Sequence, residues 1–374
     1  MFGAEEFARR VAEARAAMAA AGADLLLVDH GECLAWLTGY TVSETMYRAA
    51  LLPIAGEPWF VLRALDEDPC RRKTWLRDIV GFADTADPHG VIAETIAARG
   101  LAHARIGADF NSYGFSAHTR DRLQALLPAA RFVDLSGLSD RLRRVKSPAE
   151  LAVLAQAAAI ADEAMEAVRR AARPGITPRE ASAVAAAEFL RRGADIGDVG
   201  PIVRGAGDNE FLHGALGTEA LGEGDVLHVE LIPKVANYGA RLMRPILVGA
   251  DRRGVGRIAE RLIQLQDRQI AAMKPGAAAA EVDALLREAV LAEGLRARYD
   301  NVTGYTLGLY ARTPRTSDFS YAFRPNADWR LEAGMVFHMY ASAGGIGISE
   351  TVVVEPAGGR RLTAAPRRLL LGGT

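Results

Sequence analysis

The stretch 224–245 constrains this chain more than any other, because it predicts two strands joined by a short turn. Its first strand, Asp225–Ile232, alternates between an apolar and a polar face. The apolar face carries Leu227, Val229 and Leu231, and the other carries His228 and Glu230. Pro233 ends this strand because proline has no N–H to donate. We expect residues 236–238 to turn and Gly239–Val248 to return as the second strand.

Charged side chains on both strands make this hairpin unusual. Arg241 and Arg244 on the return strand join His228 and Glu230 on the first. A buried charge is costly unless it is paired or used. The hairpin therefore predicts either a network of ion pairs or a functional site.

Length and composition limit the classes of protein that are possible. The 374 residues suffice for two domains, and a hydrophobic content of 50% with a net charge of −1 is typical of a soluble globular protein. There is no basic excess for nucleic acid and no apolar run long enough to span a membrane. Two cysteines, Cys33 and Cys70, argue against a disulfide scaffold and favour a cytoplasmic location.

The first 140 residues alternate between helix and strand patterns. Helices are expected at Glu5–Ala21, Pro88–Arg99 and Ser116–Leu127, and strands at Leu25–Val28, Ala50–Ile54, Trp59–Leu62 and near Ile106 and Phe132. Gly22 is the expected end of the first helix. Such alternation predicts an α/β unit whose sheet is covered by helices.

Capping signals organise the rest of the chain. Ser147, Pro148 and Glu150 predict a capping box that opens a long helix to about residue 171. Thr177-Pro178 predicts the start of another helix, and a further one is expected at Val282–Ala292. Pro-Gly pairs precede both of these helices, at 174–175 and 275–276.

Several motifs resemble the pita-bread family of creatinase, prolidases and Xaa-Pro aminopeptidases. These are the hairpin at 224–245, LRRVKSP at 142–148, GYTLG at 304–308 and GMVFHMY at 334–340. The resemblance covers nearly the whole chain. It implies an α/β (α+β) fold with a creatinase-like α/β domain at 1–140 and a pita-bread catalytic domain with a curved antiparallel sheet at 141–374.

The same resemblance places the metal-ligand positions of the peptidases. They fall at Glu230, Arg241, Tyr305, Tyr340 and Glu350, so three of the five are not metal ligands of the family type. Divalent metals need several oxygen or imidazole ligands. The resemblance to metal-free creatinase therefore implies a site with no metal and no cofactor.

An alternative metal site stays open at this stage. His228 and Glu230 share one strand face, and His338 shares another with Tyr340. These side chains could form a different, single-metal site, or His228 and His338 could be hydrogen-bonded core residues.

His213 and Glu350 are the predicted catalytic residues. His213 lies eleven residues before Gly224, the spacing at which the family places a substrate-facing histidine, and imidazole can exchange a proton near neutral pH. Glu350 matches a family glutamate that creatinase keeps without metal. The plainer alternatives are a surface-loop histidine and a structural ion pair.

The remaining site residues indicate a small substrate with a carboxylate. Arg241 and Arg244 offer forked donors, and Tyr305 and Tyr340 offer hydroxyl groups, with Glu230 beside them. The carboxylate that recognises guanidinium in creatinase falls at Met243, which argues against creatine. We expect metal-independent hydrolysis of a C–N bond, with Glu350 orienting His213. The alternatives are an Xaa-Pro peptidase, a non-catalytic metabolite- or peptide-binding protein, and a lyase.

Two further expectations concern assembly and access. Family members of this type are usually homodimers in which the partner's first domain closes the site, and Tyr47 and Arg48 lie where creatinase supplies such contacts. The polar, aromatic segment Tyr310–Pro325, which includes Arg312, is either a lid or a solvated surface loop.

Overall fold

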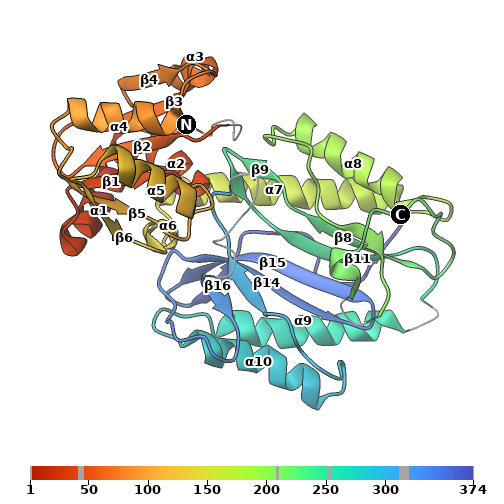
Figure 1. Cartoon of the computed structure of the whole chain (residues 1–374). Coiled ribbons are helices and arrows are strands. Elements are labelled where there is room, and N and C mark those ends of the chain that lie inside the picture. The colour runs from red at the N-terminus through yellow and green to blue at the C-terminus, as the bar shows by residue number, and fades with distance from the viewer. Residues whose placement is uncertain (1, 41–45, 208–209, 252–253, 311–319, 374) are drawn as a thin grey trace. The chain divides into compact units, whose positions relative to one another are not determined.

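A computed structural model describes residues 2–40, 46–207, 210–251, 254–310 and 320–373. The chain divides into two units, the first running to Arg143 and the second starting at Arg144. Each unit has a sheet of its own with helices packed on it, as Figure 1 shows. This is the predicted two-domain α/β architecture.

The first unit is built on a six-stranded mixed sheet in the order β4-β3-β2-β1-β5-β6. Its strands are β1 (Leu25–Val28), β2 (Ala49–Pro53), β3 (Trp59–Arg63), β4 (Asp78–Phe82), β5 (Arg105–Ala108) and β6 (Arg131–Asp134). Its helices are α1 (Ala4–Ala21), α2 (Gly31–Thr38), α3 (Glu67–Arg71), α4 (Pro88–Ala98), α5 (Ala117–Leu126) and α6 (Leu138–Arg143), with a 3-10 turn at η1 (Ala64–Asp66). The expected strands and three expected helices are confirmed, and Gly22 ends α1 at a φ of 66°. The short helices α2, α3 and α6 were not expected.

The second unit contains a four-stranded, a five-stranded and a two-stranded sheet. The four-stranded sheet has the order β17-β11-β8-β7, from β7 (Ile202–Arg204), β8 (Val226–Leu231), β11 (Leu242–Leu247) and β17 (Leu370–Leu371). The five-stranded sheet has the order β13-β12-β14-β15-β16, from β12 (Gly304–Thr306), β13 (Ala322–Phe323), β14 (Val336–Ala343), β15 (Ile346–Glu355) and β16 (Gly358–Arg361). The small ribbon pairs β9 (Lys234–Val235) with β10 (Tyr238–Gly239).

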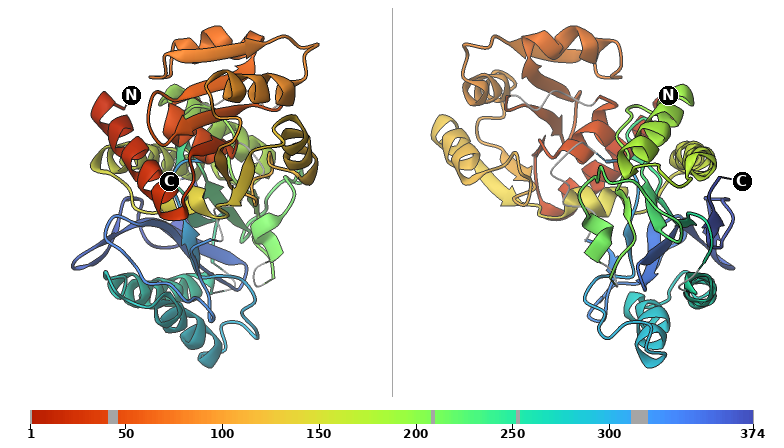
Figure 2. Two further views of the ribbon diagram at one scale, coloured as in Figure 1. Left: turned by 60° about the vertical axis from the view of Figure 1, so that its left-hand side comes forward. Right: turned by 90° about the vertical axis from the view of Figure 1, so that its right-hand side faces the viewer.

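Two helix pairs cover these sheets. They are α7 (Pro148–Ala171) with α8 (Pro178–Arg191), and α9 (Val255–Ala271) with α10 (Ala279–Ala292). One apolar core joins α7 and α8 to β8 and β11, and two others join α9 and α10 to β14 and β15. The views in Figures 1 and 2 show the two pairs on opposite sides of the strands within this unit. The strands β8, β11, β14 and β15 are therefore held between two helical layers.

The predicted capping box at the start of α7 is formed, and α8 begins at the predicted Thr177-Pro178 with a second box that was not predicted. The Ser147 side chain accepts from the Glu150 N–H and Glu150 accepts from the Ser147 N–H, with Pro148 in the first turn of α7. Thr177 and Glu180 make the same reciprocal pair at α8. Each cap satisfies two backbone donors that a helix leaves unpaired at its start.

The central hairpin differs from its prediction in one respect. The return strand is not continuous, because β10 and β11 are separated at 240–241. The Arg241 N–H donates to Thr351 Oγ1 at 2.8 Å, and Thr351 Oγ1 donates back to the Arg241 carbonyl at 2.9 Å. This exchange with β15 replaces the strand ladder at Arg241 and ties the two sheets together.

Neither face of β8 is exposed. Leu227, Val229 and Leu231 pack against the helices α7 and α8, whereas His228 and Glu230 are 0% and 3% exposed on the other face. The alternation predicted two different faces, and the structure shows that both are buried. The charged face must therefore find its partners inside the protein.

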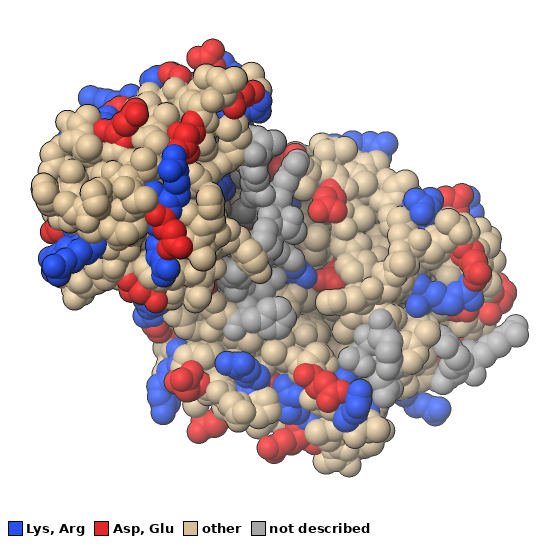
Figure 3. Space-filling view, viewed as in Figure 1, with Lys and Arg blue, Asp and Glu red and all other residues tan. Residues whose placement is uncertain are grey.

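On the face in Figure 3, positive and negative side chains are interspersed over the described surface of both units. None of the helices that the structure describes is both long enough and apolar enough to cross a membrane.

Candidate active site

Glu230 and Arg241 form a buried ion pair on the central hairpin. Arg241 Nη1 donates to Glu230 Oε1 at 3.0 Å, and the two side chains are only 11% and 4% exposed. The Arg241 guanidinium also lies over the ring of Tyr305, with its central carbon 5.3 Å from the ring centre. The structure thus brings together three of the predicted site residues.

Arg244 and Glu350 form a second buried pair, and both side chains are 0% exposed. Arg244 Nη2 donates to Glu350 Oε1 at 2.8 Å. The other four N–H donors of Arg244 bind the backbone carbonyls of Met243, Ser349, Ala365 and Pro366. All five donors are used within the protein, which is the pattern of an arginine that ties strands together rather than one that awaits a ligand.

Glu350 is surrounded by partners of its own. Beside Arg244, Thr363 donates to Oε2, and Arg367 Nε lies 2.9 Å from Oε1, although it is not aligned for a hydrogen bond. Within the part of the chain that the structure describes, Glu350 makes no contact with His213. The expected orientation of the imidazole by Glu350 is therefore not seen. Glu350 is too fully enclosed by Arg244, Thr363 and Arg367 to reach an exposed side chain.

His228 and His338 are completely buried. Neither ring nitrogen of His228 has a hydrogen-bond partner, and burial lowers the pKa of His228 to about 3. His338 Nδ1 pairs with the Tyr305 hydroxyl at 2.9 Å, whereas its Nε2 has no partner. Burial, with Arg241 and His228 nearby, holds the pKa of His338 well below its usual range. Both imidazoles are therefore neutral.

The residues at this site do not fit the metal ions that the peptidases hold. Glu230 is paired with Arg241, and Glu350 is enclosed by Arg244 and Arg367. Over the described ranges, no group of three or more His, Cys, Asp or Glu side chains is placed to hold a metal ion. The alternative site built on His228, Glu230 and His338 is thus not formed by these side chains.

An aromatic cluster lies beside the Glu230–Arg241 pair. Tyr305 and Tyr340 meet edge to face at 5.9 Å, and Tyr340 stacks on His338 at 5.2 Å. Met243 belongs to the same cluster, as do Val203, Phe211, Leu212 and Ala322. Asn301 Nδ2 donates to the Tyr340 hydroxyl at 3.2 Å. Burial raises the pKa of Tyr340 to about 12, so this hydroxyl keeps its proton near neutral pH.

His213 is the last residue of the 3-10 turn η2 (Glu210–His213), and it directly follows two residues of this cluster. Phe211 and Leu212 are buried in the cluster, and the Phe211 ring meets His228 at 4.7 Å. His213 follows them and is exposed, with no side-chain hydrogen bond or ion pair to any described residue. The fold therefore anchors the turn through its apolar side chains and leaves the imidazole open to solvent.

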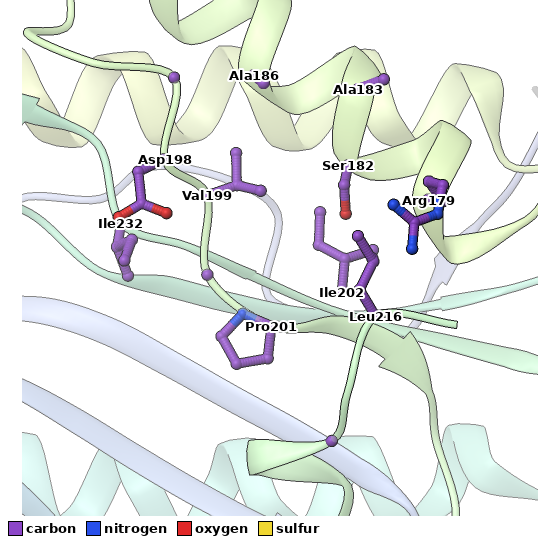
Figure 4. A pocket seen from close by; sticks show the side chains of 13 residues that line it. Arg179, Ser182, Ala183, Ala186, Asp198, Val199, Pro201, Ile202, Leu216 and Ile232 are labelled. Atoms are coloured by element: carbon purple, nitrogen blue, oxygen red, sulfur yellow. The ribbon is translucent and has the colours of Figure 1, made fainter. Parts of the chain in front are cut away.

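Two pockets adjoin this turn. One, of about 630 Å³, lies between α8 and the segment 197–202, and the other, of about 730 Å³, is lined by Val203, Phe211 and the segment 214–219. Gly214 and Leu216, just after His213, line both. Figure 4 shows Arg179 and Asp198 at opposite ends of the first pocket, with Ser182 between them. Its other walls are mainly apolar.

Arg48 lies in the first unit, where its Nη1 donates to the Asp29 carbonyl at 3.2 Å. Tyr47 donates to Asp29 Oδ2 at 3.0 Å, and burial raises the pKa of Asp29 to about 6. The role of Arg48 toward a partner subunit stays a prediction. Most of the predicted lid, including Arg312, lies outside the described residues.

The fold and this site define a two-domain protein of the pita-bread class, and sequence comparison places it in a family. Residues 152–356 match the model of metallopeptidase family M24, and residues 10–145 match the creatinase/prolidase N-terminal domain. The first match spans more than half of the chain, so the chain belongs to metallopeptidase family M24. It is a hydrolase of that family, which confirms the resemblance seen in the motifs.

Individual relatives are distant. The chain is 25% identical to an ectoine hydrolase of Halomonas elongata, over 99% of this chain and 98% of that protein. It is 27% identical to an Xaa-Pro dipeptidase of Pyrococcus furiosus, over 61% of this chain and 66% of that protein. The structure of dipeptidase PepE from Mycobacterium ulcerans superposes with a TM-score of 0.81 at 25% identity, covering 99% of both chains.

Sequence reasoning missed several residues at this site. Arg367 and Thr363 come from the C-terminal segment, where arginines in a charge run usually face solvent. Asn301 and Arg296 lie in the segment between α10 and β12. No spacing or motif in the sequence distinguishes these residues, because only the three-dimensional fold brings them next to Glu350 or Tyr340.

Proposed function

We propose that this protein hydrolyses a C–N bond in a small carboxylate-bearing amino-acid derivative, and that it does so without a metal ion. The observation that carries the proposal is the state of the two carboxylates at family ligand positions. Glu230 is held by Arg241, and Glu350 is held by Arg244 and Arg367. Freeing either carboxylate for a metal would break a buried ion pair, which costs about 3–5 kcal/mol.

In this proposal His213 supplies the proton transfers. Its imidazole is exposed, and the next residue, Gly214, lines two pockets. His213 takes a proton from an attacking water and returns it to the leaving nitrogen. The reaction adds water across the C–N bond and yields a carbonyl-side product and an amine. Glu350 has no contact with His213. In this proposal it acts indirectly, by holding the buried Arg244 and Arg367 in place.

Tyr340 and Tyr305 provide the polar surface on which charge develops. The Tyr340 hydroxyl accepts from Asn301 and keeps its own proton to donate. A hydroxyl donor aimed at a developing oxyanion is worth a substantial part of the catalytic effect in acyl transfer. Arg241 holds Glu230 in place and presents a positive charge beside Tyr305.

The family and two of its relatives support the proposed substrate class. Ectoine and Xaa-Pro dipeptides, named by two relatives, belong in a substrate panel with N-acylated and guanidino amino acids. The test is product formation from this panel, followed by mass spectrometry, for the wild-type protein and for His213→Ala. We expect turnover that H213A abolishes while circular dichroism shows an unchanged fold.

Each other outcome has a definite meaning. Turnover retained by H213A would refute the proton-transfer role. Binding of panel compounds without turnover by the wild-type protein would indicate a non-catalytic binding protein instead. An eliminated, unhydrated product would identify a lyase.

A further inference from the structure

Arg296 is a buried cation without a carboxylate partner. It lies between α10 and β12 and is 3% exposed. No Asp or Glu oxygen within the described ranges lies within ion-pair distance of it. Burying an unpaired charge is costly, so an arginine in this state needs another explanation.

The other buried arginines of the second unit give the contrast. Arg241 pairs with Glu230, Arg244 with Glu350 and Arg287 with Asp283, each at 3.0 Å or less. Arg287 is only four residues from its partner on the same helix. The fold therefore neutralises its buried arginines where it can, and Arg296 is the exception among those the structure describes.

Neutral groups alone hold the Arg296 guanidinium. Nη1 donates to Asn301 Oδ1 at 2.9 Å and to Ser342 Oγ at 3.4 Å, and the Tyr299 ring lies 4.1 Å from the central carbon. Nε is buried with no acceptor. These contacts fix the direction of the side chain but leave its charge and part of its donor fork unused.

Arg296 is linked through Asn301 to Tyr340 of the proposed active site. Asn301, which accepts from Arg296, donates through Nδ2 to the Tyr340 hydroxyl at 3.2 Å. Tyr340 in turn packs on Tyr305 and His338. The unpaired charge thus lies two hydrogen bonds from a hydroxyl that we place in the site.

We propose that Arg296 is the anion-binding residue of this site and that it binds the carboxylate of the substrate. The inference rests on the proposed function. It assigns to Arg296 the binding of the substrate carboxylate that was predicted for Arg241 and Arg244, because Arg241 pairs with Glu230 and all five donors of Arg244 are used. A planar guanidinium with free donors matches a carboxylate geometrically. The bound carboxylate would supply the negative charge that the fold omits.

The test compares ligands that differ only in charge. Binding of N-acetylglycine and of its neutral amide is measured by calorimetry for wild-type protein, Arg296→Gln and Arg298→Gln. Arg298 is the control because it is 85% exposed and pairs with Asp300 at the surface. We expect the wild-type and R298Q proteins to prefer the carboxylate by about tenfold or more, and R296Q to lose that preference.

Stability provides the second readout. Since R296Q removes an uncompensated charge, its unfolding midpoint should stay near the wild-type value, whereas Arg287→Gln strands Asp283 and should lower the midpoint clearly. A carboxylate preference that survives in R296Q, or is missing in the wild-type protein, overturns the inference. The binding assay needs no turnover. An absence of hydrolysis would therefore refute the proposed reaction without affecting the proposed anion site.

Discussion

The chemistry of this protein is decided by which charged residues have partners. Glu230 and Glu350 are the two carboxylates at the metal-ligand positions that the motif resemblance implies, yet each is bound by arginine. Arg296 is buried with neutral neighbours only. The same residue types would support different chemistry if the pairs were exchanged, so residue identity alone does not define the site.

A first prediction separates a structural from a catalytic role for Glu350. Glu350→Gln leaves Arg244 and Arg367 without a counter-charge in a buried site, and should lower the free energy of unfolding by about 3–5 kcal/mol. Glu355→Gln is the control, because its pair with Arg360 is exposed and is worth about 0–1 kcal/mol. Urea unfolding measures both. Wild-type stability of E350Q together with lost turnover would instead support direct catalysis.

A second prediction concerns acid sensitivity. The folded pKa of His228 is about 3, against 6.5 for an ordinary histidine, so the unfolded chain binds more protons between these values. Stability should therefore fall as pH is lowered from about 6.5 toward 3. His228→Leu removes this contribution, and its unfolding midpoint should fall less steeply over that range. Parallel pH profiles for the two proteins would contradict the buried, neutral state of His228.

At the scale of elements, the tight turn between β9 and β10 sets the register of the central hairpin. Ala236 and Asn237 occupy it with φ values of 52° and 65°, which disfavour a side chain other than Gly, Asn or Asp. Asp195 stabilises the turn by accepting from both backbone N–H groups, at 2.9 and 2.6 Å.

Ala236→Gly should therefore stabilise the protein by about 0.5–1 kcal/mol, because glycine adopts positive φ without steric cost. Ala272→Gly, at a φ of −79° near the end of α9, should change stability in the opposite direction. The thermal unfolding midpoints of the two variants, compared with the wild-type protein, measure both changes. A destabilised A236G would mean that the turn adopts another conformation in solution.

Local signals made most elements predictable. The Ser147–Glu150 capping box, the helix start at Thr177-Pro178 and the apolar run of β1 are signals that act within a few residues, and the structure has all three. The break at Arg241 was not predictable, because it depends on Thr351, 110 residues away. The same holds for the site. The hairpin charges and Glu350 were visible in sequence. The contacts of Thr363 and Arg367 with Glu350, and the contact of Arg296 with Ser342, join distant segments and could not be predicted.

At the scale of the whole molecule, we propose a homodimer in which Arg48 serves the partner's site. Mixing inactive His213→Ala chains with inactive Arg48→Gln chains should restore roughly a quarter of wild-type activity, because mixed dimers then contain one intact site. Sedimentation should give twice the mass of one chain. No recovery on mixing, with dimers present, would assign Arg48 to its own chain.

The central claim is hydrolysis without metal, and elemental analysis joined to a rate measurement tests it most directly. The protein is purified without added metal, dialysed against a chelator, and assayed for metal content and for turnover of the substrate that the panel identifies. We predict no stoichiometric metal and an unchanged rate, because arginines hold Glu230 and Glu350. A rate that vanishes on chelation and returns with one or two bound metal ions per chain would contradict the account.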